Sequence, residues 1–370
     1  MKPLNAIQSQ LKALHDAGKP VLGCFPLYPP LELIHSLGIA PAVLWGFKPY
    51  FTQVSLADRH LQNYACSVGR YLVEFVLQDA GETLDGLLMY NACDTLRNLP
   101  EIIDRGLAKD AALPLHTFHV PAVSMERSGA KEYLKDRLEG LIAWLEATFS
   151  VKFDPDSFEK SVSLYAEMHG LMQKAQKYVG EGKALFSELA ELCGKLNFML
   201  VEDQITALQE FCRACEEKTA APTGSQVVIS GILPPPPEIL KAMERAGLAI
   251  VGNDLANMHR AWAYSPAPSK DPAAYYADFY ENHFPCTTLL PTADRRLPAL
   301  ESMLEDCGAG AWIFAGEKFC EYEYFELPYV EKALKAKGIG VLSLEFSLGD
   351  EQNLGSMKTR IEAFAEMIEE

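Results

Sequence analysis

Basic residues are scarce in this sequence. Its 33 Lys and Arg stand against 50 Asp and Glu, which gives a formal net charge of −17. A protein that binds nucleic acid needs a basic surface facing the phosphates, so the acidic composition argues against nucleic-acid binding. Any anionic ligand must instead be held by a local cluster of hydrogen-bond donors.

Long apolar runs are also missing. The longest uncharged stretch, 219–237, contains five prolines and two glycines, and the N-terminus does not resemble a secretory signal. We therefore expect a soluble, cytoplasmic protein without membrane contact. We do not expect disulfides between its nine cysteines in a reducing compartment, so each is a small hydrophobe, a metal ligand or a nucleophile.

Nucleotide-binding signatures are absent as well. Residues 180–183 (Gly-Glu-Gly-Lys) lack the spacing and the Ser or Thr of a phosphate-binding loop. The glycines at 308 and 310 precede a predicted strand, whereas a dinucleotide fingerprint follows one. The pair 212–215 (Cys-Arg-Ala-Cys) lies in a helical pattern without a second pair, which favours a structural role over a redox or zinc site.

The chain does contain ample material for a core, since 49% of its 370 residues are hydrophobic. That length suggests two α/β units. Short apolar runs bounded by turns alternate with helical patterns, which is typical of parallel sheets covered on both faces. These runs are 21–24, 42–45, 86–90, 113–120, 227–229, 249–251, 312–314 and 341–344.

The runs fall into two similar halves. Each half begins with a strand, a proline-rich turn, a helix, a glycine and a second strand. Between the halves the pattern is helical, and Asp154 before Pro155 is a good helix start. We predict two similar doubly wound domains, 1–128 and 223–370, with a helical segment and linker at 129–222. Ligands of such folds lie beyond the carboxyl ends of the strands.

Three cysteines occupy suitable places for ligands at those strand ends. Cys93 and Cys320 follow the equivalent third strand of the two halves, and Cys66 opens a helical stretch. Their separations of 27 and 227 residues match no compact metal motif. From spacing alone, the alternative of three unrelated buried thiols stays open.

Several stretches together resemble the subunits of 2-hydroxyacyl-CoA dehydratases and of the related ATP-dependent benzoyl-CoA reductases. They cover nearly the whole chain outside the helical segment. The matching stretches are 30–34 (Pro-Leu-Glu-Leu-Ile) with Gly38, 65–66 (Ala-Cys), 93–99 (Cys-Asp-Thr-Leu-Arg-Asn-Leu), 252–255 (Gly-Asn-Asp-Leu), 285–286 (Pro-Cys) with 294–296 (Asp-Arg-Arg), 319–320 (Phe-Cys) and 359–364 (Thr-Arg-Ile-Glu-Ala-Phe).

The resemblance implies two flavodoxin-like domains with a [4Fe–4S] cluster between them. The family's three cluster cysteines match Cys66, Cys93 and Cys320, which leaves one iron open to a ligand. It also implies a homologous second subunit, as a heterodimer or a homodimer, and a separate ATP-dependent iron–sulfur activator. One-electron reduction of an acyl-CoA thioester to a ketyl radical would then lead to loss of the 2-hydroxyl group, or the electrons would reduce an aromatic ring.

Other residues are weaker candidates. Some relatives carry a Cys-x-Cys near position 286 and hold a double cluster, but this sequence has Thr288 at the second position and Pro26 near a further expected cysteine. Cys286 is therefore interpreted as a loop thiol rather than a ligand. The candidates for substrate binding are Glu32, Arg260, Arg295 and Arg296.

Each of those candidates has an alternative. The arginines would meet the phosphates of CoA or form surface salt bridges, and Glu32 would favour its helix start through the helix dipole. Two other functions also stay open for the chain: a non-catalytic electron-relay or scaffold subunit, and a metal-free protein with two lobes that binds a small molecule.

Overall fold

A computed structural model describes residues 6–25, 27–45, 53–78, 80–106, 113–349 and 353–369. It contains two four-stranded sheets in which every neighbouring pair of strands is parallel. The strands of the first are β1 (Val21–Phe25), β2 (Ala40–Val43), β3 (Gly86–Tyr90) and β4 (Leu115–Phe118). Those of the second are β5 (Ser225–Gly231), β6 (Leu248–Leu255), β7 (Ala311–Glu317) and β8 (Gly340–Phe346).

The two sheets have the same topology. Their strand orders are β2-β1-β3-β4 and β6-β5-β7-β8. In each half the second strand is added on one side of the first, and the third and fourth strands are added on the other side. The predicted α/β fold with two parallel sheets is confirmed. The division of the chain at residues 128 and 222 stays a prediction.

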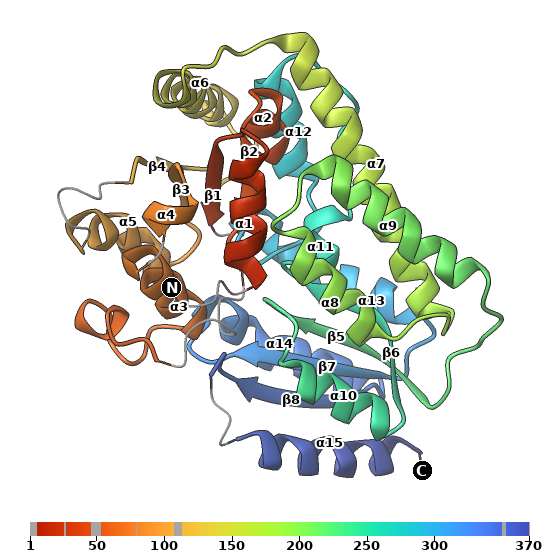
Figure 1. The fold of residues 1–370 in the computed structure, drawn as a ribbon. Coiled ribbons are helices and arrows are strands. Elements are labelled where there is room, and N and C mark those ends of the chain that lie inside the picture. Colours follow the sequence, from red (N-terminus) through yellow and green to blue (C-terminus); the bar gives the residue numbers. More distant parts are fainter. Residues whose placement is uncertain are drawn as a thin grey trace.

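Helices cover both sheets and connect them (Figure 1). In the first half they are α1 (Ala6–Asp16), α2 (Leu31–Ser36), η2 (Ala57–Arg59), α3 (Ser67–Gln78), α4 (Ala80–Thr83) and α5 (Asp94–Gly106). The middle segment holds α6 (Ala130–Phe149), α7 (Pro155–Gly180), α8 (Phe186–Leu196) and α9 (Val201–Glu216). The second half adds α10 (Pro237–Arg245), α11 (His259–Trp262), α12 (Pro272–Asn282), η4 (Leu290–Arg295), α13 (Arg296–Asp306), α14 (Glu321–Ala336) and α15 (Leu354–Glu369).

The core follows from the apolar runs. All residues of β1, β3 and β7 are buried, as expected for central strands covered on both faces. The edge strand β8 instead mixes buried and exposed positions. β2 lies two residues earlier than predicted because its pairing with β1 begins where Ala40 faces Val21, while Leu44 and Trp45 stay buried beyond the strand.

The middle helical segment joins the two sheets. The long helices α7 and α9 run along one side of the molecule, and α7 packs against both α2 and β6 (Figure 1). The predicted start of α7 is confirmed, since the Asp154 side chain accepts a hydrogen bond of 2.8 Å from the Ser157 N–H. No helix in the described ranges is both long enough and apolar enough to cross a membrane.

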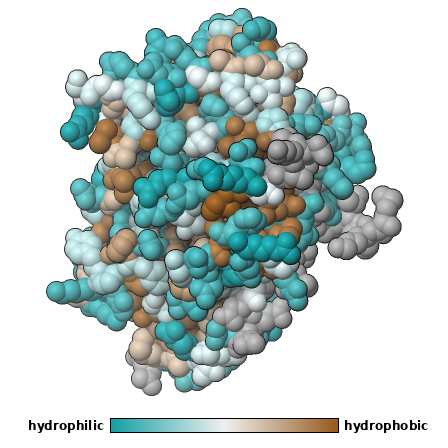
Figure 2. All heavy atoms as spheres, turned by 90° about the vertical axis from the view of Figure 1, so that its left-hand side faces the viewer, coloured by the Kyte–Doolittle hydropathy of each residue, from teal (hydrophilic) through white to brown (hydrophobic). Residues whose placement is uncertain are grey.

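The surface on the side of α5 is largely hydrophilic (Figure 2). Hydrophobic side chains gather in a patch near the middle of this face, between hydrophilic surroundings.

Candidate functional site

Cys66, Cys93 and Cys320 each stand directly before a helix. They precede α3, α5 and α14, and Cys320 is the N-cap of α14. Phe319, just before Cys320, has a left-handed backbone with φ of 67°. That conformation is strained for a bulky residue, and it occurs where the chain turns sharply from β7 into α14.

The three thiols line one pocket of about 380 Å³. Its walls come from both sheets, since Phe25 ends β1 and Glu317 ends β7. The structure thus brings the three predicted cysteines to one pocket, and their role as metal ligands stays a prediction. Three helix N-termini also converge here, and free N–H groups at such ends favour negative charge.

Gly69 lies where the first turn of α3 approaches α5. A Cβ atom at Gly69, in the first turn of α3, would lie 3.3 Å from Cγ2 of Thr95 and 3.6 Å from Sγ of Cys66. The distance to Thr95 is tighter than an ordinary contact, so a larger residue here would require the Thr95 side chain to shift. Glycine at this position therefore lets the start of α3 lie close to the start of α5.

Burial strongly affects the three thiols. It raises the pKa of Cys66 to about 12, and the Glu317 carboxyl adds to that rise. The pKa values of Cys93 and Cys320 are raised for the same reason, and that of Cys320 is raised further by Glu323 and by the two other thiols. The raised pKa values favour the neutral thiol, and binding of a positively charged group would favour the thiolate instead.

Ser67 and Glu317 form part of the pocket's framework. Glu317 Oε1 accepts hydrogen bonds from the Ser67 N–H at 2.9 Å and from Ser67 Oγ at 2.5 Å. The two residues are 250 positions apart, so the sequence analysis did not pair them. A charged residue at the end of the otherwise apolar run 311–317 was the available signal.

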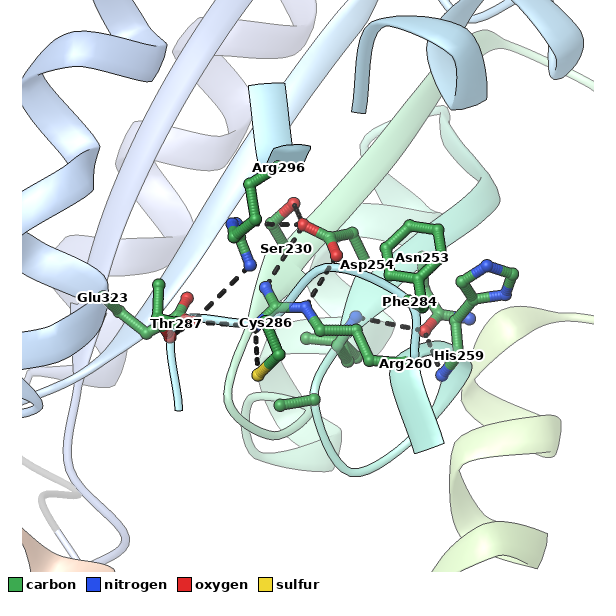
Figure 3. A network of polar contacts seen from close by, with 12 residues as sticks. Ser230, Asn253, Asp254, His259, Arg260, Phe284, Cys286, Thr287, Arg296 and Glu323 are labelled. Atoms are coloured by element: carbon green, nitrogen blue, oxygen red, sulfur yellow. Dashed lines mark hydrogen bonds and ion pairs between the residues drawn. The ribbon is translucent and has the colours of Figure 1, made fainter. Parts of the chain in front are cut away.

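Arg260 and Arg296 do not lie on the surface. Arg260 is fully buried, and its Nε and Nη1 atoms lie 2.6 Å from Asp254 Oδ1 and 2.9 Å from Glu323 Oε1 (Figure 3). Arg296 is 6% exposed, and its Nη2 lies 3.1 Å from Asp254 Oδ2. The prediction that both side chains lie on the surface is wrong, because they form ion pairs with buried carboxylates of β6 and α14.

The opposite charges in this buried network stabilise one another. Burial alone would raise the pKa of Asp254, but Arg260 and Arg296 outweigh burial and lower it. Burial likewise opposes the charged form of Arg260, yet Asp254 and Glu323 hold its pKa well above the usual value. Arg260 and Arg296 are therefore committed to internal ion pairs in this structure.

The remaining arginine candidate, Arg295, is exposed. Its Nη2 donates a hydrogen bond of 2.7 Å to the carbonyl oxygen of Glu281. This contact leaves other guanidinium donors of the exposed side chain facing solvent. Arg295 is thus the one arginine of the three that an external phosphate can reach directly.

Glu32 lies in the first turn of α2, as predicted, but it is buried. Its carboxylate accepts hydrogen bonds from Tyr275 at 3.1 Å and from Tyr276 at 2.7 Å. Burial raises its pKa, and the hydrogen bond from Tyr276 offsets part of the rise. Glu32 lines a second cavity of about 110 Å³, which shares only Leu27 and Trp45 with the thiol pocket.

The other six cysteines do not line the pocket, although Cys286 contacts Thr288 of its wall. All nine are unpaired, as predicted. Cys286 is buried, and its Sγ lies 3.5 Å from Arg260 Nη1 and 3.2 Å from Thr288 Oγ1. Cys212 and Cys215 lie within α9, which agrees with a structural role. Pro26 lies outside the described residues.

Comparison with known proteins adds a family match over most of the chain. Residues 26–368 match the family model described as "2-hydroxyglutaryl-CoA dehydratase, D-component". The chain is 26% identical to the (R)-phenyllactyl-CoA dehydratase beta subunit of Clostridium sporogenes over 366 residues, which covers 97% of this chain and 94% of the relative.

Two further relatives extend this picture. The lactoyl-CoA dehydratase subunit beta of Anaerotignum propionicum is 26% identical, with 100% of both chains covered. A benzoyl-CoA reductase subunit of Thauera aromatica is 25% identical, with 93% of this chain and 88% of the relative covered. These relatives are therefore similar to this chain along almost its entire length, and they include both dehydratase and reductase subunits.

Proposed function

Because the chain belongs to the 2-hydroxyglutaryl-CoA dehydratase D-component family, we propose that it is the iron–sulfur subunit of a 2-hydroxyacyl-CoA dehydratase or benzoyl-CoA reductase-type enzyme. The observation that carries the proposal is the convergence of Cys66, Cys93 and Cys320 on one pocket between two parallel sheets. The relatives named above are subunits of enzymes of both types.

The donor set fits a [4Fe–4S] cluster better than a single ion. Within the part of the chain that the structure describes, no three His, Cys, Asp or Glu side chains are arranged to hold one metal ion. Three soft thiols on separate walls of a wide pocket suit a cluster, in which each thiolate binds a different iron. With three protein ligands, a fourth iron would have an open position.

When bound, such a cluster would pass single electrons to an acyl-CoA thioester, either for loss of a 2-hydroxyl group or for reduction of an aromatic ring. The chain's own residues would hold the cluster and limit its contact with water. The N-termini of α3, α5 and α14 would stabilise its negative charge through their free N–H groups. The apolar side chains of Phe25 and Ile232 in the pocket wall would lower the local polarity.

An electron-relay subunit is the second candidate, and one observation favours it. Of the four predicted substrate contacts, Glu32, Arg260 and Arg296 are satisfied by internal partners, which leaves only Arg295 exposed. In that arrangement a homologous second subunit would bind most of the acyl-CoA. Electrons would reach either kind of subunit from an ATP-dependent iron–sulfur activator.

Iron analysis of cysteine variants tests the cluster. Anaerobically purified wild-type chain should be brown and contain about four irons per chain. Changing Cys66, Cys93 or Cys320 to Ala should remove most of the iron. Cys193→Ala and Cys212→Ala are matched controls on the helical segment and should keep it. Iron loss in Cys212→Ala with full iron in Cys93→Ala would overturn the ligand assignment, and a colourless wild-type chain would favour the metal-free alternative.

Spectroscopy separates the two candidate functions. If this chain binds the substrate, adding an acyl-CoA should change the EPR spectrum of its reduced cluster. If it is a relay, the spectrum should stay the same until the second subunit is added. An Arg295→Ala variant should weaken the acyl-CoA effect only in the first case.

A further inference from the structure

Glu317 connects the two cysteine-bearing loops that come from different sheets. Its side chain accepts two hydrogen bonds from Ser67, the residue directly after Cys66. Its main-chain carbonyl oxygen accepts a hydrogen bond of 3.0 Å from the N–H of Cys320. One residue therefore contacts the backbone at both thiols, although β7 and α3 belong to different halves of the molecule.

A third loop is tied to the same point. Ser67 Oγ donates to Glu317 and at the same time accepts a hydrogen bond of 2.8 Å from the Leu348 N–H. Leu348 follows β8, and Phe346 at the end of β8 accepts a bond from the Lys318 N–H at 2.7 Å. The segment after β8 thus contacts both Ser67 and the residue that follows Glu317.

Packing alone does not explain a carboxyl group at this place. Glu317 is 1% exposed, and no ion pair joins it to a Lys, Arg or His among the described residues. Its Oε2 atom is buried and accepts no hydrogen bond there. Burying a carboxyl without a cation is costly, whereas Asp254 has two arginines. An apolar residue would fill this position at lower cost, so the two bonds to Ser67 are the feature that requires an acceptor.

We propose that Glu317 is a positioning residue that sets the separation of Cys66 and Cys320 before any group enters the pocket. Cys66 and Cys93 need no such connection, because α3 and α5 pack on each other within the first half. Cys320 is the thiol that the other half must bring into place. The inference rests on the proposed function only for what the three thiols bind.

Crosslinking within the metal-free, full-length chain tests this directly. A short bifunctional thiol reagent is applied, and mass spectrometry of peptides gives the ratio of Cys66–Cys320 to Cys66–Cys93 products. Glu317→Ala should lower that ratio about fivefold, because thiols that are no longer held in place react together less often. Glu317→Gln keeps an oxygen acceptor for Ser67 and should stay within about twofold of wild type.

Glu74→Ala is the matched control. Glu74 is also a fully buried glutamate, and it also accepts hydrogen bonds from backbone N–H groups, those of Leu56 and Ala57 at 2.8 and 2.9 Å, besides one from the Gln78 side chain. All four residues lie in the first half, so this variant should lose stability without changing the crosslink ratio. A general loosening of the fold would instead lower the ratio in both alanine variants, and that result would overturn the inference.

Ser67→Ala keeps the test decisive if Glu317→Ala does not fold. It removes the hydroxyl bond but retains the N–H bond, so the ratio should fall about twofold. An unchanged ratio in Ser67→Ala, or in a folded Glu317→Ala, would overturn the inference. Iron content is measured in parallel. A wild-type chain that binds no iron, with a ratio that still falls in Glu317→Ala, would refute the proposed function and leave the positioning role standing.

Discussion

Arg260 Nη1 donates a hydrogen bond to Cys286 Sγ at 3.5 Å, at a point where the arginine has no exposed surface. The same nitrogen contacts Glu323, three residues after Cys320. The arginine network and the thiol pocket therefore share the first turn of α14.

Arg260→Met should strongly destabilise the protein. The substitution leaves Asp254 and Glu323 buried with only Arg296 nearby, and breaking a buried ion pair from one side costs about 3–5 kcal/mol. Urea unfolding followed by circular dichroism measures the change. Arg295→Met removes an exposed arginine and should stay within about 0.5 kcal/mol of wild type. Equal losses in the two variants would contradict the structural role assigned to Arg260.

Cys286→Ala should keep the iron. Its sulfur already contacts Arg260 and Thr288, and the residue is not part of the thiol pocket wall. We expect a loss of about 1–2 kcal/mol in the free energy of unfolding, typical of removing a buried polar contact. Iron analysis beside Cys320→Ala is the check. A brown colour lost in Cys286→Ala would make this thiol a ligand and contradict its interpretation as a loop residue.

The sequence predicted the sheets well because their signal is local. Continuous apolar runs such as 86–90 become central strands, and a cysteine just after such a run lies at the carboxyl end of a sheet. The convergence of Cys93 and Cys320 follows from the repeated order of strands in the two halves. Periodicity therefore sufficed for the fold, whereas the grouping of Cys66 with Cys93 and Cys320 came from the family resemblance.

The polar contacts could not be predicted in this way. Arg260 pairs with Glu323, which is 63 positions away in the chain, as well as with the nearby Asp254, and Ser67 meets Glu317 over 250 positions. No local pattern distinguishes a buried arginine from an exposed one when its partners are distant. The expectation of surface arginines consequently fails at Arg260 and Arg296 and holds at Arg295.

His169 should make the protein sensitive to mild acid. Burial lowers its pKa from an ordinary value of 6.5 to about 4, so it stays neutral in the folded protein while the unfolded chain binds a proton. The free energy of unfolding should therefore fall as the pH drops from about 6.5 to 4. At 1.36 kcal/mol per pKa unit the loss is at most about 3 kcal/mol. Below the folded pKa, no further loss comes from this group.

His169→Gln provides the comparison. Glutamine can retain a hydrogen bond to Ser265, which His169 contacts at 2.7 Å, but it has no proton to gain in this range. Urea unfolding at pH 7, 6, 5 and 4.5 should give a flatter profile for this variant than for wild type. Parallel profiles would show that His169 does not contribute to the acid sensitivity.

Glu32 should lower the free energy of unfolding as the pH rises, whereas His169 lowers it as the pH falls. Because burial raises its pKa, the charged form is less favourable in the folded protein than in the unfolded chain. Its contribution to stability is thus complete at low pH and is lost as the pH rises above the ordinary carboxyl range. Glu32→Gln should be more stable than wild type at pH 8 by a margin that shrinks toward pH 4.

Tyr276→Phe removes the 2.7 Å hydrogen bond that favours the charged form of Glu32, so the stability of this variant should fall more steeply with rising pH than that of wild type. A Glu32→Gln margin that does not change with pH would mean that this carboxyl keeps an ordinary pKa, and its burial would then have to be balanced by a cation outside the contacts described above.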